Sequence, residues 1–230
     1  MLTLFHHNMS CNSRAIRLIL FEYEIPSTLV EEQEWARRAE FLRYNPACTI
    51  PVLLTENGDP IVESYAIIEY LDETVGRQKK DKWLFPANPI ARAEVRRLLS
   101  WFLQKFKDEV TRPIVRQRIY KREMPTSIGG GAPDSTILRH ARSNIRPHME
   151  YLNWLAKDNN CLTGDNLTYA DFAAAGGVSV LDYLGEIDWN TYPYAKEWYT
   201  RIKSRPSMRP LLFDRIRGIA PSSSYTDLDF

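Results

Sequence analysis

Hydrophobic and polar positions along the first 80 residues follow the order expected for a small mixed α/β unit. Residues 2–6 and 27–32 alternate loosely between apolar and polar side chains, which predicts two strands. Between them, an apolar stripe compatible with a packed helix covers residues 13–24, and Pro26 ends it. A strand, a helix and a second strand in succession predict a right-handed β-α-β crossover.

The rest of this unit is expected to hold two helices and a pair of short strands. Residues 35–42 have the pattern of a short amphipathic helix, and residues 64–73 have that of a longer one. Residues 51–55 and 60–63 flank an Asn57-Gly58-Asp59 turn, which predicts a hairpin-like strand pair. We therefore expect a first domain that ends near residue 80.

The remainder of the chain has helical patterns only. After a polar linker over residues 81–89, an all-helical domain is expected over residues 90–217, followed by an extended tail over residues 218–230. Glycines make residues 129–133 a loop. The predicted helices cover residues 91–120 with an interruption near Pro113, residues 135–156 with a kink at Pro147, and residues 170–184, 194–203 and 208–217.

The helix over residues 170–184 is apolar on nearly every face, which predicts that it is buried within its domain. It opens with a capping-box pattern, in which Thr168 is the N-cap and Asp171 reaches back to the N-cap amide. Leu167 and Phe172 flank the box as a hydrophobic staple. This motif is expected to serve the fold, because a fully buried helix cannot leave its first amides to water.

Composition places the chain among ordinary globular proteins, with 44% hydrophobic and 26% charged residues in 230. No apolar run approaches the ~20 residues that span a bilayer, so no membrane insertion is expected. Cys11, Cys48 and Cys161 are an odd, scattered set without metal-ligand spacing. They argue against a disulfide framework and a metal site, and for a reducing, cytoplasmic location.

Charge is divided unevenly between the two parts of the chain. Residues 1–85 carry 9 basic and 13 acidic side chains, whereas residues 86–230 carry 21 and 16, and much of the basic charge lies in residues 92–122. This pattern indicates either an anionic partner for the second domain or a solvated basic helix face. Nucleic acid is not expected, because no reader motif is present and the pI is about 7.7.

The order of these motifs resembles the cytosolic glutathione transferase fold, a thioredoxin-like α/β domain followed by an all-α domain, over about residues 1–215. The resemblance rests on residues 10–14, Ile50-Pro51 as a candidate cis bond, Glu63-Ser64 and the capping box. It implies that Ser10 stabilises a glutathione thiolate, that the backbone of Val52 pairs with the cysteinyl part, and that Glu63 and Ser64 hold the γ-glutamyl end. A cysteine-type mechanism at Cys11 is the neighbouring alternative. A purely structural alternative is that Ser10 or Ser13 caps the helix that follows.

A narrower resemblance covers essentially the whole chain. It is to transferase-like bacterial division proteins that bind FtsZ, the tubulin-like polymer of the division ring. This resemblance implies a homodimer at the division site that alters FtsZ filament curvature, helps couple the ring to septal wall synthesis and requires no cofactor. Trp35 and Asp227 match the family's FtsZ-binding positions. The alternatives are core packing for Trp35, a frayed tail for Asp227, and a glutathione-conjugating enzyme for the whole. The segments that carry the resemblance are residues 101–105, 111–113, 129–135, 181–189, 204–207 and 225–230.

Overall fold

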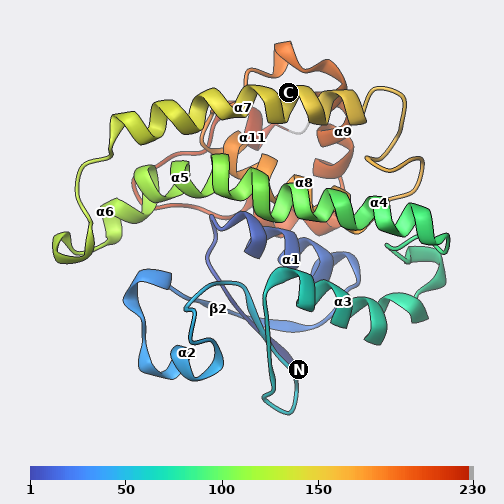
Figure 1. Cartoon of the computed structure of the whole chain (residues 1–230), viewed down its shortest axis with the longest axis horizontal. Coiled ribbons are helices and arrows are strands. Elements are labelled where there is room, and N and C mark those ends of the chain that lie inside the picture. Colours follow the sequence, from blue (N-terminus) through green and yellow to red (C-terminus); the bar gives the residue numbers. More distant parts are fainter. Residues whose placement is uncertain (228–230) are drawn as a thin grey trace.

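A four-stranded mixed sheet forms the base of the molecule in the computed structural model, which describes residues 1–227 (Figure 1). Strand β1 pairs in parallel with β2 and antiparallel with β3, and β3 pairs antiparallel with β4, in the order β2-β1-β3-β4. The predicted β-α-β opening and strand pair are confirmed. The strands are β1 (Leu2–His6), β2 (Ser27–Glu31), β3 (Val52–Leu54) and β4 (Pro60–Val62).

Helices α1 (Cys11–Glu22) and α3 (Ser64–Thr74) lie between the sheet and the helical part of the chain (Figure 1). Their buried side chains join the main core cluster, which continues without a break into the second domain. A smaller cluster around Phe41 forms separately, with α2 (Ala39–Tyr44) and the start of β3. The sheet therefore connects two apolar layers of very different size.

The prediction of one helix over residues 35–42 is wrong. A short 3₁₀ turn, η1 (Glu34–Ala36), is followed by Arg37 in the left-handed region at φ +46°, and α2 starts only at Ala39. Trp35 packs against the main core, whereas Phe41 packs into the smaller cluster. The left-handed residue provides the turn between these two packing directions.

One long helix begins the second domain and runs through Pro113 without the predicted interruption, which is therefore wrong. The amide of Arg112 bonds to the carbonyl of Lys107, five residues back, so Pro113 stands where the hydrogen-bonding pattern changes. Its missing N–H costs least at such a junction. The helix consists of α4 (Pro89–Ser100), the π-bonded η4 (Trp101–Thr111), α5 (Arg112–Val115), the π-bonded η5 (Arg116–Tyr120) and α6 (Lys121–Glu123).

Helix α8 (Tyr169–Tyr183) is buried along its entire length, as predicted, and its capping box is formed. Asp171 also accepts hydrogen bonds from the amide of Leu162 and the indole of Trp198, both at 2.9 Å. The helix packs closely on α1 at Gly176, where a Cβ would lie 2.5 Å from the carbonyl oxygen of Cys11. Only glycine permits this approach of the two backbones.

Of the remaining helices, α9 and α11 pack against α8, and no helix within residues 1–227 is long and apolar enough to cross a bilayer. Helix α7 lies beside the long helix, with Pro147 inside it (Figure 1). These helices are α7 (Ser135–Leu155), α9 (Pro193–Lys203), α10 (Arg209–Leu212) and α11 (Ser223–Thr226), and short 3₁₀ turns cover Gly76–Gln78, Lys80–Lys82, Thr126–Ile128, Trp189–Thr191 and Pro206–Met208.

Two predictions for the C-terminal part are wrong. The helix expected over residues 208–217 ends at Leu212, because Asp214 instead pairs with Arg17 at 2.8 Å, a contact that draws the chain toward α1. The tail is not extended throughout, since α11 forms one turn that buries Tyr225 completely. Residues 228–230 of the predicted tail lie outside the described residues.

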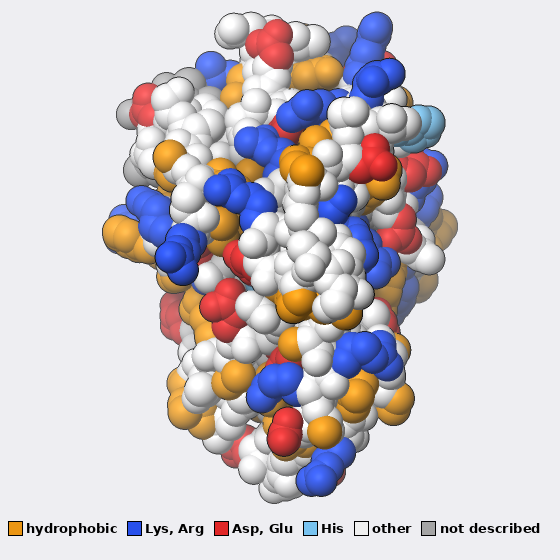
Figure 2. Space-filling model, turned by 90° about the vertical axis from the view of Figure 1, so that its left-hand side faces the viewer, with side chains coloured by type: hydrophobic (Ala, Val, Ile, Leu, Met, Phe, Trp, Pro, Cys, Tyr) orange, Lys and Arg blue, Asp and Glu red, His pale blue; other side chains and the backbone are white. Residues whose placement is uncertain are grey.

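Most of the basic charge in residues 92–122 is neutralised by neighbouring carboxylates. On the face shown in Figure 2, which is the left-hand side of Figure 1, Lys and Arg side chains stand among hydrophobic and acidic ones. Of the two interpretations given above, a solvated helix face therefore describes most of this helix, and its cations are also ion-paired. The pairs are Arg92–Asp72, Arg96–Glu69, Arg97–Glu94, Lys105–Glu109, Lys107–Asp108 and Arg118–Glu186.

Candidate functional site

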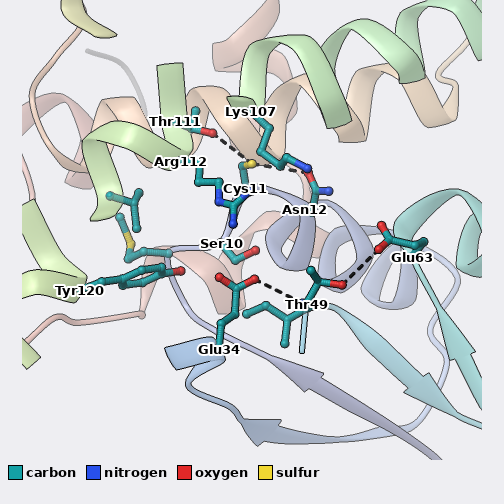
Figure 3. Close-up of a pocket in the computed structure, with 13 residues that line it drawn as sticks. Ser10, Cys11, Asn12, Glu34, Thr49, Glu63, Lys107, Thr111, Arg112 and Tyr120 are labelled. Atoms are coloured by element: carbon teal, nitrogen blue, oxygen red, sulfur yellow. Dashed lines mark hydrogen bonds between the residues drawn. The ribbon is translucent and has the colours of Figure 1, made fainter. Parts of the chain in front are cut away.

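A pocket lies where the first domain meets the long helix (Figure 3). The first domain contributes the start of α1 and the loops before β3 and α3, and the helix contributes the opposite wall. The enclosed space is about 70 Å³, well below the ~300–1,000 Å³ of typical small-molecule sites. A tripeptide would therefore have to lie across the open mouth. The lining residues include Ser10, Cys11, Asn12, Glu34, Thr49, Glu63, Lys107, Thr111, Arg112 and Tyr120.

Ser10 lines this pocket and is also the N-cap of α1. Its hydroxyl oxygen accepts a hydrogen bond from the amide of Ser13 at 3.3 Å, so the helix-capping alternative is confirmed for Ser10. The hydroxyl hydrogen is left to donate toward the pocket, where Figure 3 places the side chain. A role in binding a thiolate stays a prediction that this geometry permits.

Cys11 is held as a thiol. Its side chain is buried, and its sulfur accepts a hydrogen bond from the hydroxyl of Thr111 at 3.1 Å. Burial raises the pKa of the Cys11 thiol above its ordinary value, and the bond from Thr111 only partly offsets this. Since the thiolate is the nucleophile, this environment does not favour a cysteine-type mechanism.

Of the residues expected to hold glutathione, Glu63 lines this pocket, whereas Val52 and Ser64 are not among its lining residues. The Ile50-Pro51 bond is cis. Val52 is fully buried and pairs with Phe5 on one side and Val62 on the other, so both edges of the strand are occupied there and the predicted backbone pairing with a peptide does not fit this structure. Glu63 has a positive φ of +74° and accepts a hydrogen bond from Thr49 at 3.1 Å.

Ser64 begins α3 and is only 2% exposed. Within residues 1–227 its hydroxyl has no hydrogen-bond partner. A buried unpaired hydroxyl at a helix N-terminus fits a carboxylate, as the γ-glutamyl assignment requires.

The two residues predicted to bind FtsZ lie in different parts of the molecule. Trp35 is half-buried at the domain boundary, with its ring 4.6 Å from that of Tyr120 and 6.0 Å from that of His7. Asp227 is exposed at the end of α11, and its carbonyl oxygen accepts a hydrogen bond from the buried Lys203 of α9. The structure does not bring Trp35 and Asp227 into one pocket.

Sequence reasoning missed much of the wall formed by the long helix. Lys107 and Arg112 are five residues apart, a spacing that places them on different faces of an α-helix. In the π-bonded segment, hydrogen bonds join residues i and i+5, and both side chains reach the pocket (Figure 3). Glu34 was also missed; its carboxylate accepts from the amide of Ile50 at 3.4 Å, and burial raises its pKa.

Two family models match this chain, the glutathione S-transferase N-terminal domain over residues 9–74 and the glutathione S-transferase C-terminal domain over residues 138–206. The chain belongs to the glutathione S-transferase family. Among its relatives, FtsZ-localized protein A of Caulobacter vibrioides is 38% identical over 99% of this chain and 98% of its own length. Both resemblances drawn from the sequence are thereby confirmed.

Solved structures agree with this assignment. A glutathione S-transferase from Sinorhizobium meliloti 1021 is 56% identical with a TM-score of 0.98, and the match covers all of both chains. FzlA from C. crescentus is 38% identical with a TM-score of 0.89, over 100% of this chain and 99% of its own. The predicted fold, a thioredoxin-like domain followed by an all-helical domain, is confirmed.

Proposed function

We propose that this protein binds FtsZ and acts in bacterial cell division. The observation that carries the proposal is the 38% identity with FtsZ-localized protein A over 99% of this chain, a span that leaves out neither domain. The site supports a role without obligatory catalysis, because burial raises the pKa of the Cys11 thiol and so disfavours a cysteine-type mechanism. The pocket is also small for a tripeptide.

In this proposal the protein is a cytoplasmic homodimer at the division site. It alters the curvature of FtsZ filaments and helps couple the division ring to septal wall synthesis, without nucleic acid as a partner. Trp35 and Asp227 are the proposed contacts. Both offer exposed surface, and Trp35 rests on a buried aromatic neighbour, Tyr120, as interface anchors commonly do.

Co-sedimentation with GTP-polymerised FtsZ tests the proposal. We expect the wild-type protein to pellet with the polymer, and a Trp35→Ala, Asp227→Lys double variant to stay in the supernatant. Trp35→Phe, which keeps a ring over Tyr120, and Asp165→Lys, a charge reversal at another exposed aspartate, are the matched controls and should pellet. A wild-type protein that never pellets refutes the function. A double variant that pellets normally refutes the two contacts.

A second candidate is a glutathione transferase, favoured by the unpaired hydroxyl of Ser64. Glutathione would supply the thiol, with Ser10 directed at its sulfur and Glu63 and Ser64 along the peptide. Titration calorimetry discriminates between the candidates. Millimolar or absent binding, without conjugation of a standard electrophile, argues against the enzyme. Tight binding that is lost in Ser64→Ala, with conjugation lost in Ser10→Ala, would favour it.

A further inference from the structure

A surface hollow beside Trp35 collects arginine side chains from both domains. Arg37 comes from the first domain, directly after η1, and Arg112 and Arg116 come from the long helix, one turn apart. Trp35 and Tyr120 form its aromatic part. We call this feature the Trp35 hollow.

The three arginines of the Trp35 hollow are exposed. Within residues 1–227 none of them has a carboxylate within 4.0 Å, in contrast to most of the basic residues on the same long helix. The only carboxylate among the residues that line the hollow is Glu34, which is turned toward the amide of Ile50. Glu34 interacts electrostatically with Arg112. One carboxylate therefore stands against three guanidinium groups, and the hollow carries an excess of positive charge.

The aromatic part of the hollow is firmly supported. Trp35 rests against Tyr120, which is 6% exposed. Tyr120 in turn contacts the buried ring of His7 edge-on, at 4.8 Å between centroids. Because His7 directly follows the first strand and Tyr120 belongs to the long helix, the indole is braced by both domains. A braced tryptophan surrounded by arginines has the composition of an interface hot spot.

We propose that the Trp35 hollow binds an acidic segment of a protein partner, with carboxylates on Arg37, Arg112 and Arg116 and an apolar side chain against Trp35. Guanidinium groups hold carboxylates in paired hydrogen bonds, which suits aspartate and glutamate side chains. A protein segment is favoured over a small molecule because the hollow is open and its cations are exposed, whereas small ligands are mostly enclosed. The identification of the partner as FtsZ rests on the function proposed above.

A labelled peptide tests the hollow without FtsZ. The probe is a short fluorescein-labelled peptide of alternating glutamate and leucine, and its anisotropy is followed on titration with the full-length protein at low and physiological salt. We expect salt-sensitive binding that weakens about tenfold or more in Arg37→Glu and in Arg116→Glu. Arg116→Lys, which keeps the charge but cannot form the paired hydrogen bonds, should bind more weakly than the wild type and more tightly than Arg116→Glu.

Arg139→Glu on α7 is the matched control, because Arg139 is exposed, has no ion pair within the described chain and changes the net charge by the same amount. Binding by Arg139→Glu should stay within about twofold of wild type. Equal losses in Arg116→Glu and Arg139→Glu would show a general charge effect and overturn the proposal. Absence of peptide binding by the wild type, or its displacement by millimolar glutathione, would also overturn it.

The same variants in the FtsZ co-sedimentation assay separate the two proposals. If the wild type and Arg116→Glu pellet equally, FtsZ binding stands and the hollow is refuted as its contact. If the wild type does not pellet but Arg116→Glu still loses the peptide, the hollow stands and its acidic partner is a protein other than FtsZ. Loss of both pelleting and peptide binding in Arg37→Glu and Arg116→Glu, with Arg139→Glu unaffected, is the result we expect.

Discussion

Removing one hydroxyl from the C-terminal turn tests how the two domains are held together. The ring of Tyr225 is fully buried, and its hydroxyl donates to the carbonyl oxygen of Leu211 at 2.6 Å and accepts from the guanidinium of Arg14. Arg14 lies on α1 in the first domain and is itself fully buried. Tyr225→Phe fills nearly the same space but leaves one N–H of Arg14 and one carbonyl without this partner.

The structure sets the size of the expected effect. A hydrogen bond to a charged group contributes about 1.5–3 kcal/mol. At about 2–4 °C per kcal/mol for a chain of this length, Tm should fall by roughly 3–12 °C in Tyr225→Phe. Calorimetry and urea unfolding measure it. The control is Thr226→Val, an exposed change in the same turn that should cost no more than about 0.5 kcal/mol. Equal melting of Tyr225→Phe and wild type would show that this hydroxyl does not stabilise the contact between the two domains.

Three further predictions concern the core and its titration. Thr168→Ala removes the N-cap of α8 and should lower the free energy of unfolding by about 1 kcal/mol in urea, and no change would contradict the cap. Gly176→Ala should prevent stable folding, because its Cβ would lie 2.5 Å from the carbonyl oxygen of Cys11, and a normal melting curve would show that α1 and α8 can separate at little cost. Burial, with Arg17 nearby, lowers the pKa of His6 from 6.5 to about 4. The stability that the protein gains from keeping His6 neutral is fully present above about pH 6.5. It is lost as the pH falls toward 4, by up to about 1.4 kcal/mol per pH unit, because the unfolded chain binds the proton more readily. Histidine NMR titration checks this, and a His6 pKa near 6.5 would contradict it.

Local patterns predicted the elements whose shape depends on their own residues. The capping box at Thr168 and the all-round apolar helix after it each need only adjacent side chains, and both formed as expected. The cis bond before Pro51 likewise follows from one residue type and its place before a strand. Elements that depend on distant partners were predicted less well. The turn that buries Tyr225 exists because Arg14, over 200 residues earlier, offers a buried cation.

The residues of the candidate site also divide into those that local motifs predicted and those that only the fold brings together. Ser10 and Glu63 line the pocket, as the motifs indicated. Lys107 and Arg112 were missed because the helix changes to π bonding, which no 3.6-residue periodicity registers. The clustering of Arg37 with Arg112 around Trp35 joins residues of two domains, so no local spacing reveals it.

Pelleting with FtsZ tests the central claim most directly. The wild-type protein is centrifuged with FtsZ in the presence of GTP, where FtsZ polymerises, and in the presence of GDP, where it does not. We expect the protein to pellet only with the polymer, equally with and without millimolar glutathione. Protein that stays in the supernatant while FtsZ pellets would contradict it.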